Sequence, residues 1–161
     1  MGLLNFLFGE SDAKKQQRIQ EENKCIKQEQ TFFDSHTAKA IINATVDLVT
    51  NLNGPVVKLM RTNINAEFYL KVKSSAIEIE TYVLAEVYEK GLRKRVSKEF
   101  CKFADYGLNN LGRARMTGLG ALISRQLCEV NWLETDGYGH DDSYSIRIKR
   151  KKGTSIPEIL F

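Results

Sequence analysis

The sequence predicts an α+β protein, in which helices accompany a small antiparallel sheet that includes a C-terminal β-hairpin. Three observations support this fold class. Apolar side chains recur at helical spacing over residues 38–52, and they alternate with polar side chains over residues 66–73. Over residues 127–152, two alternating segments flank a polar loop that contains two glycines, which is typical of a hairpin.

Length and composition indicate one globular domain. The chain has 161 residues, of which 42% are hydrophobic and 27% are charged. We expect an apolar tip and a polar helical arm over residues 1–30, a single α+β domain over 31–153 and a tail over 154–161. Three widely spaced cysteines form neither a disulfide framework nor a metal motif, which favours a cytoplasmic protein.

The N-terminal tip is apolar, and the segment that follows it is polar. Residues 11–30 contain few apolar side chains, so we expect a solvated helix or a semi-flexible arm there. The tip could pack on its own domain, dock on a protein partner as an adaptor subunit does, or touch a membrane surface peripherally. The side chains that would make these contacts are Leu3, Leu4, Phe6, Leu7 and Phe8.

A long helix is expected next, followed by a strand. Asp34 or Ser35 can cap the helix, and the turn residues 53–55 end it. Its apolar stripe comprises Ala38, Ile41, Ile42, Thr45, Leu48, Val49 and Leu52. The alternation over residues 66–73 predicts a half-buried strand, and residues 56–60 are its expected partner strand.

Three shorter helices are expected before the hairpin. Ser75 and Glu78 have the spacing of a capping box, which predicts a helix over residues 75–91, although the alternation at its start would suit a strand. Further helices are expected over residues 97–107 and 113–127. Three helices followed by a hairpin have the element order of a winged helix, so the second half could be winged-helix-like.

The expected hairpin has one apolar face and one cationic edge. The side chains expected on its buried face are Cys128, Val130, Trp132, Ile146 and Ile148. Arg147 and Lys149 then point outward, where they could contact phosphates or simply solvate and protect an edge strand. The cations of residues 150–152 lie past the alternation, so edge protection explains them less well.

Positive charge is concentrated in the second half of the chain, where residues 91–161 hold 13 Lys and Arg against 8 Asp and Glu. This favours non-enzymatic binding of a nucleic acid or another polyanion. The expected contacts are Arg113, Arg115, Arg125, Arg147, Lys149, Arg150, Lys151 and Lys152. A second basic group, residues 93–95 with Lys98 and Lys102, could be a solvated connector or a further polyanion contact.

The loop over residues 136–142 is the strongest enzymatic candidate in the sequence. His140 and the carboxylates Asp136, Asp141 and Asp142 could bind a metal or act as acid and base. Their spacing matches neither an EF-hand nor a zinc motif, and the same residue types suit a turn. We therefore expect no cofactor and keep a metal-dependent enzyme as a distant alternative.

Overall fold

The computed structural model describes residues 11–84 and 92–158. The chain forms two compact units, residues 1–35 and residues 36–161. Within the described ranges, no helix is both long enough and apolar enough to cross a bilayer.

The first unit contains the helix α2, Asp12–Asp34. The hydroxyl oxygen of Ser11 caps its first turn by accepting a hydrogen bond from the backbone nitrogen of Lys14 at 3.4 Å. Most side chains of α2 are exposed to solvent, including the apolar Ile19 and Ile26. The polar segment is therefore a solvated helix, which was one of the two expected forms.

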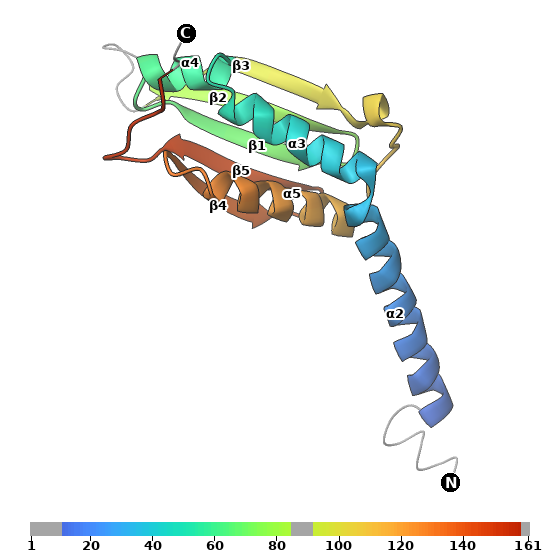
Figure 1. Ribbon diagram of the computed structural model, residues 1–161. Coiled ribbons are helices and arrows are strands. Elements are labelled where there is room, and N and C mark those ends of the chain that lie inside the picture. The colour runs from blue at the N-terminus through green and yellow to red at the C-terminus, as the bar shows by residue number, and fades with distance from the viewer. Residues whose placement is uncertain (1–10, 85–91, 159–161) are drawn as a thin grey trace. The chain divides into compact units, whose positions relative to one another are not determined.

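The second unit is a five-stranded antiparallel sheet with helices on one face (Figure 1). The strand order is β3-β2-β1-β5-β4. The strands are β1 (Glu67–Lys73), β2 (Ala76–Leu84), β3 (Arg93–Lys102), β4 (Leu133–Gly139) and β5 (Ser143–Arg150), and the helices are α3 (His36–Thr50), α4 (Pro55–Thr62) and α5 (Arg113–Cys128). The predicted α+β fold class is confirmed.

The core lies between the sheet and the helices α3 and α5, which run along the same face (Figure 1). Helix α5 packs on β1, β4 and β5, and α3 packs on α5. Strand β1 contributes Phe68, Leu70 and Val72 to this core, and each is at most 1% exposed. The expected strand over residues 66–73 and the two expected helices that became α3 and α5 are confirmed.

Two glycines make room for the ring of Tyr144 in β5. A Cβ atom on Gly120 of α5 would lie 2.1 Å from the ring carbon Cδ1 of Tyr144, and one on Gly137 of β4 would lie 2.6 Å from its hydroxyl oxygen. Side-chain atoms at these distances would overlap, so the packing of α5 and β4 around this ring requires glycine. This explains why α5 contains a residue of low helix propensity.

The helix expected over residues 75–91 is wrong for its described part, because Ala76–Leu84 forms the strand β2. Residues 85–91 lie outside the described residues. In a capping box, the carboxylate of Glu78 would accept from the helix backbone; instead it lies 2.9 Å from Lys73 Nζ across the sheet. Strand β2 pairs with β1 on one side and β3 on the other. These two sets of interstrand hydrogen bonds override the local capping signal.

The expected helix over residues 97–107 is also wrong. Arg93–Lys102 forms the edge strand β3, and the single 3-10 turn Phe103–Tyr106 follows it. Gly107, with φ of 75°, ends that turn in the left-handed conformation that glycine allows. Two of the three helices that suggested a winged helix are therefore largely replaced by strands, and the winged-helix resemblance is not confirmed.

Residues 56–60 do not form a strand beside β1, because they lie in the helix α4, Pro55–Thr62. Proline at the first helical position has a backbone angle already suited to a helix. Val56 and Met60, one helical turn apart, are both buried. Pro55 therefore follows the end of α3 and is also the first residue of α4.

The C-terminal hairpin is present, but its first strand begins later than expected. Helix α5 continues to Cys128, so Cys128 and Val130 lie outside the hairpin, and Trp132 directly precedes β4. Ile148 pairs with Thr135 and Ile146 with Gly137. The expected first strand was placed too early, because Gly137 and Gly139, which were assigned to the loop, pair with Ile146 and Tyr144 inside the hairpin.

Candidate functional site

The sheet face opposite α3 and α5 carries a network of ion pairs. Its centre holds Glu67 of β1 with Glu78 and Glu80 of β2, whose side chains are 14%, 9% and 10% exposed. The cations that pair with them are Lys71, Lys73, Arg93, Arg95, Lys98, Arg147 and Lys149. Each central carboxylate is paired with cations, as its burial requires.

Glu67 of β1 binds cations from strands on both sides of it, Arg93 of β3 on one side and Arg147 and Lys149 of β5 on the other. Its carboxylate lies 2.8 Å from Arg93 Nη1, 2.6 Å from Arg147 Nη2 and 3.2 Å from Lys149 Nζ, and it accepts a hydrogen bond from the hydroxyl of Tyr69 at 3.0 Å. Burial alone would raise the pKa of Glu67. The hydrogen bonds from Arg147, Lys149 and Tyr69 outweigh burial and lower this pKa to about 2.

Glu78 and Glu80 bind the cations nearer to β3. The hydrogen bond from Lys73 lowers the pKa of Glu78, although burial acts in the opposite direction. Lys98 Nζ lies 3.4 Å from Glu78 and 4.0 Å from Glu80. The hydroxyl of Tyr82 donates to Glu80 at 2.8 Å, and this hydrogen bond raises the pKa of Tyr82. Both carboxylates on this part of the face are therefore held by more than one cation.

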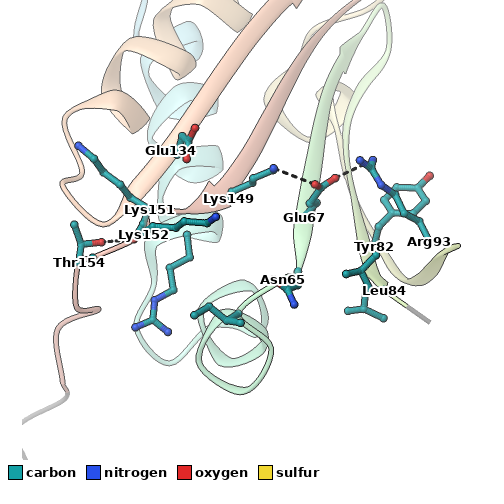
Figure 2. A pocket seen from close by; sticks show the side chains of 15 residues that line it. Asn65, Glu67, Tyr82, Leu84, Arg93, Glu134, Lys149, Lys151, Lys152 and Thr154 are labelled. Carbon is teal, nitrogen blue, oxygen red and sulfur yellow. Dashed lines mark hydrogen bonds and ion pairs between the residues drawn. The ribbon is translucent and has the colours of Figure 1, made fainter. Parts of the chain in front are cut away.

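A cleft of about 480 Å³ lies at one end of the sheet, where β1, β3 and β4 begin and β2 and β5 end. Lys151, Lys152 and Thr154 lie on one side of it and Tyr82, Leu84 and Arg93 on the other, as Figure 2 shows. Glu67 lies between the two sides, with Arg93 and Lys149 bound to its carboxylate (Figure 2). A cleft of this volume can hold a small organic molecule.

Positive charge exceeds negative charge in the cleft. Five cations line it, including Arg93 and Lys149, together with two carboxylates, Glu67 and Glu134. The other three cations, at residues 150–152, form no ion pair with another residue of the described part of the chain. By contrast, every cation of the ion-pair network has a carboxylate oxygen within 4.0 Å.

The turn that carries Lys151 and Lys152 is fixed by hydrogen bonds. The backbone nitrogen of Lys151 donates to the carbonyl oxygen of Trp132 at 2.9 Å, and the hydroxyl of Thr154 donates to the carbonyl oxygen of Lys151 at 2.7 Å. Gly153 has φ of 78°, a conformation that side-chain-bearing residues rarely adopt. These contacts fix the course of the backbone that carries the two lysines.

The cleft also has an apolar surface. Ile64 is 68% exposed and Leu84 is 48% exposed, and Val83 lines the cleft beside them. Exposed apolar side chains gathered in a concave site are typical of ligand contacts. The cleft can therefore bind a ligand that has both an anionic part and an apolar part.

A second hollow of about 90 Å³ adjoins the cleft on the open face, and the two share Glu134 and Lys149. Asp136 and Arg147 complete its charged lining. Two carboxylates thus balance two cations, so this hollow has no surplus of positive charge.

The structure separates the residues that the sequence suggested for nucleic-acid binding. Arg147 and Lys149 lie in the ion-pair network, and residues 150–152 line the cleft. Arg113, Arg115 and Arg125 lie on α5, which packs on the other face of the sheet. Arg113 Nη1 is 3.4 Å from Asp141 in the β4–β5 turn, at the opposite end of the sheet from the cleft.

Sequence reasoning missed part of the cleft. Ile64, Leu84 and Arg93 line it, but they are brought together by the pairing of β1, β2 and β3. The basic group at residues 93–95 was a usable signal, although an extended edge strand was not foreseen there. The suggested tip residues Leu3, Leu4, Phe6, Leu7 and Phe8 lie outside the described residues.

The loop over residues 136–142 does not bring its candidate metal ligands together in the described structure. In the described part of the chain, no three His, Cys, Asp or Glu side chains are arranged to hold a metal ion. Asp136 lies in β4, and the side chain of Asp141 is 96% exposed beside Arg113. The backbone nitrogen of His140 donates to the carbonyl oxygen of Ser143 at 2.8 Å, which closes a tight turn.

Comparison with known proteins identifies no relative. No protein-family model, no curated protein and no solved structure matches this chain.

Proposed function

We propose that this protein is a non-enzymatic binder of single-stranded nucleic acid, which it holds at the cationic cleft. The observation that supports this function most directly is the group Arg150, Lys151 and Lys152. These three consecutive cations line the cleft and form no ion pair with any other described residue. Cations of this kind bind phosphates, and the release of counterions from the nucleic acid drives such binding.

Apolar and aromatic side chains favour a single strand over a duplex. Unstacked bases have flat faces that pack on aromatic and apolar side chains. Ile64 and Leu84 offer such a surface inside the cleft. Tyr82 adds an aromatic ring to the lining of the cleft. The bases of a duplex stay stacked on one another, so a duplex could contact the cations but could not pack bases on these side chains.

Fluorescence anisotropy with a single strand and a duplex of equal length tests this function. With about three phosphate contacts, affinity for the single strand should fall roughly tenfold or more between about 50 and 200 mM salt. The single strand should also bind more tightly than the duplex. Failure of both probes to bind at the lower salt concentration would refute the proposal.

A pair of double variants locates the binding surface. Lys151→Ala/Lys152→Ala and Arg113→Ala/Arg125→Ala each remove two positive charges, the first at the cleft and the second on α5. The cleft variant should weaken binding and reduce the slope of log K against log salt by about 1 to 2. The α5 variant should change binding much less. A larger effect of the α5 variant would contradict a site at the cleft.

A further inference from the structure

We propose that the cleft recognises a phosphorylated strand end, that is, a terminal phosphomonoester together with its nucleotide. This inference rests on the proposed function and specifies the part of the nucleic acid that enters the cleft. Its support comes from the distribution of charge, the size of the cleft and the apolar side chains beside the cations.

The charge of the cleft suits a terminal phosphate better than an internal one. A phosphomonoester carries between one and two negative charges at neutral pH, whereas an internal diester carries one. Arg150, Lys151 and Lys152 supply three positive charges that no described carboxylate pairs with. Arg93 and Lys149 add two more, held by Glu67 at 2.8 and 3.2 Å.

The size of the cleft favours an end over an internal stretch. About 480 Å³ is enough for one or two nucleotides, and the adjoining hollow offers only about 90 Å³. Along the rest of the network, each cation already has a carboxylate within 4.0 Å. A long strand would therefore find cations without an ion-pair partner at the cleft, whereas the cations beyond it are already engaged by carboxylates.

The apolar side chains give the terminal nucleotide a second contact. Ile64 and Leu84 lie in the same cleft as the cations, and Leu84 faces the lysine turn from the opposite side (Figure 2). A base packed on these side chains would cover apolar surface that water now contacts, which is favourable. Asn65 and Thr154 offer polar groups beside it. The cleft therefore suits a phosphate joined to a nucleoside better than phosphate alone.

Competition binding with three unlabelled oligonucleotides of one sequence tests the inference. They carry a 5′-phosphate, a 3′-phosphate or hydroxyls at both ends, and they displace an internally labelled strand. One phosphorylated form should bind about tenfold more tightly than the hydroxyl form, as expected for charge-assisted hydrogen bonds to the added charge. Lys151→Ala/Lys152→Ala should bring this ratio close to one, whereas Arg113→Ala/Arg125→Ala should preserve it.

The outcomes separate this inference from the proposed function. Equal affinity for all three strands would overturn end recognition and leave strand binding intact. If none of the strands binds, strand binding itself is refuted.

A second set of competitors identifies the recognised unit. A nucleoside monophosphate should displace the probe more weakly than the phosphorylated strand, and inorganic phosphate more weakly still. Ile64→Ser should weaken both nucleotide ligands, and it should fold because Ile64 is 68% exposed; circular dichroism checks this. If the monophosphate displaces the probe as strongly as the phosphorylated strand does, the ligand is a free nucleotide and not a strand end. If inorganic phosphate displaces the probe as strongly as the monophosphate does, the apolar side chains contribute nothing to binding.

Discussion

Glu67 shows how one buried carboxylate organises the charged face. It is joined to Arg93 from β3 and to Arg147 and Lys149 from β5, although Arg147 is 80 positions away in the sequence. Its pKa of about 2 means that the carboxylate stays charged in the folded protein under conditions where it would be partly protonated in the unfolded chain. Glu67 thus stabilises the fold and orients two of the cations in the cleft.

The low pKa of Glu67 predicts a loss of stability in acid. Because this pKa is below the ordinary value near 4.5, the unfolded state takes up the proton first, and the contribution of Glu67 is lost as pH falls from about 4.5 towards 2. In urea unfolding at about pH 6 and pH 3, Glu67→Gln should therefore lose less stability than the unmodified protein. We expect a difference of about 1–2 kcal/mol after allowance for solvent screening.

Glu129→Gln is the matched control, because Glu129 is an exposed carboxylate outside the network. This variant should keep the acid sensitivity of the unmodified protein. If Glu67→Gln and Glu129→Gln lose stability equally between the two pH values, the ion pairs of Glu67 do not stabilise the fold as described.

At the scale of elements, helix α5 contacts the hairpin where the backbone at glycine positions approaches the ring of Tyr144 closely. The ring of Tyr144 on β5 meets Gly120 of α5 and Gly137 of β4. Helix propensity alone would favour alanine over glycine in α5 by about 1 kcal/mol. The contact with Tyr144 opposes that preference and decides which residue fits.

Gly120→Ala should therefore destabilise the protein despite its better helix propensity. The added methyl group would lie 2.1 Å from a ring carbon of Tyr144, so α5 or the ring must shift, at a net cost of about 1–3 kcal/mol. Gly112→Ala is the control, because a Cβ there meets nothing within 4 Å. Thermal unfolding of both variants measures the effect, and an unchanged or higher Tm for Gly120→Ala would contradict this packing.

At the scale of the whole molecule, the sheet separates two environments. One face forms the apolar core with α3 and α5, and the other carries the ion-pair network. Adjacent residues of β5 lie in different environments. Ile148 is fully buried, and Lys149 pairs with Glu67 at 3.2 Å. The alternation of a strand places these two side chains on opposite faces.

Adding a charge at position 148 and removing one at position 149 should change the stability of the protein by very different amounts. Ile148→Lys would bury an unpaired ammonium group, which costs several kcal/mol and should prevent stable folding of a domain this size. Lys149→Ile removes one partly exposed ion pair and should cost about 1 kcal/mol or less. Far-ultraviolet circular dichroism and urea unfolding distinguish the two variants. Comparable stabilities would show that the two faces do not differ in this way.

The sequence by itself determined the elements whose evidence is local. The apolar stripe of α3, the alternation of β1 and the helical spacing of α5 each lie within one short segment, so periodicity predicts them without knowledge of the partner. The same is true of the α+β class and of a hairpin near the C-terminus. The concentration of cations at residues 150–152 was likewise visible in the printed sequence.

Only the tertiary structure decided β2, β3 and the composition of the cleft. Ser75 and Glu78 satisfy a helix-capping pattern, and pairing with two neighbouring strands overrides it because interstrand hydrogen bonds depend on residues distant in the sequence. The same long-range pairing joins Arg147 to Glu67 and leaves Lys151 and Lys152 without an ion-pair partner among the described residues. Sequence shows where charges occur, but the fold decides which of them are compensated, because ion pairing depends on distance in space.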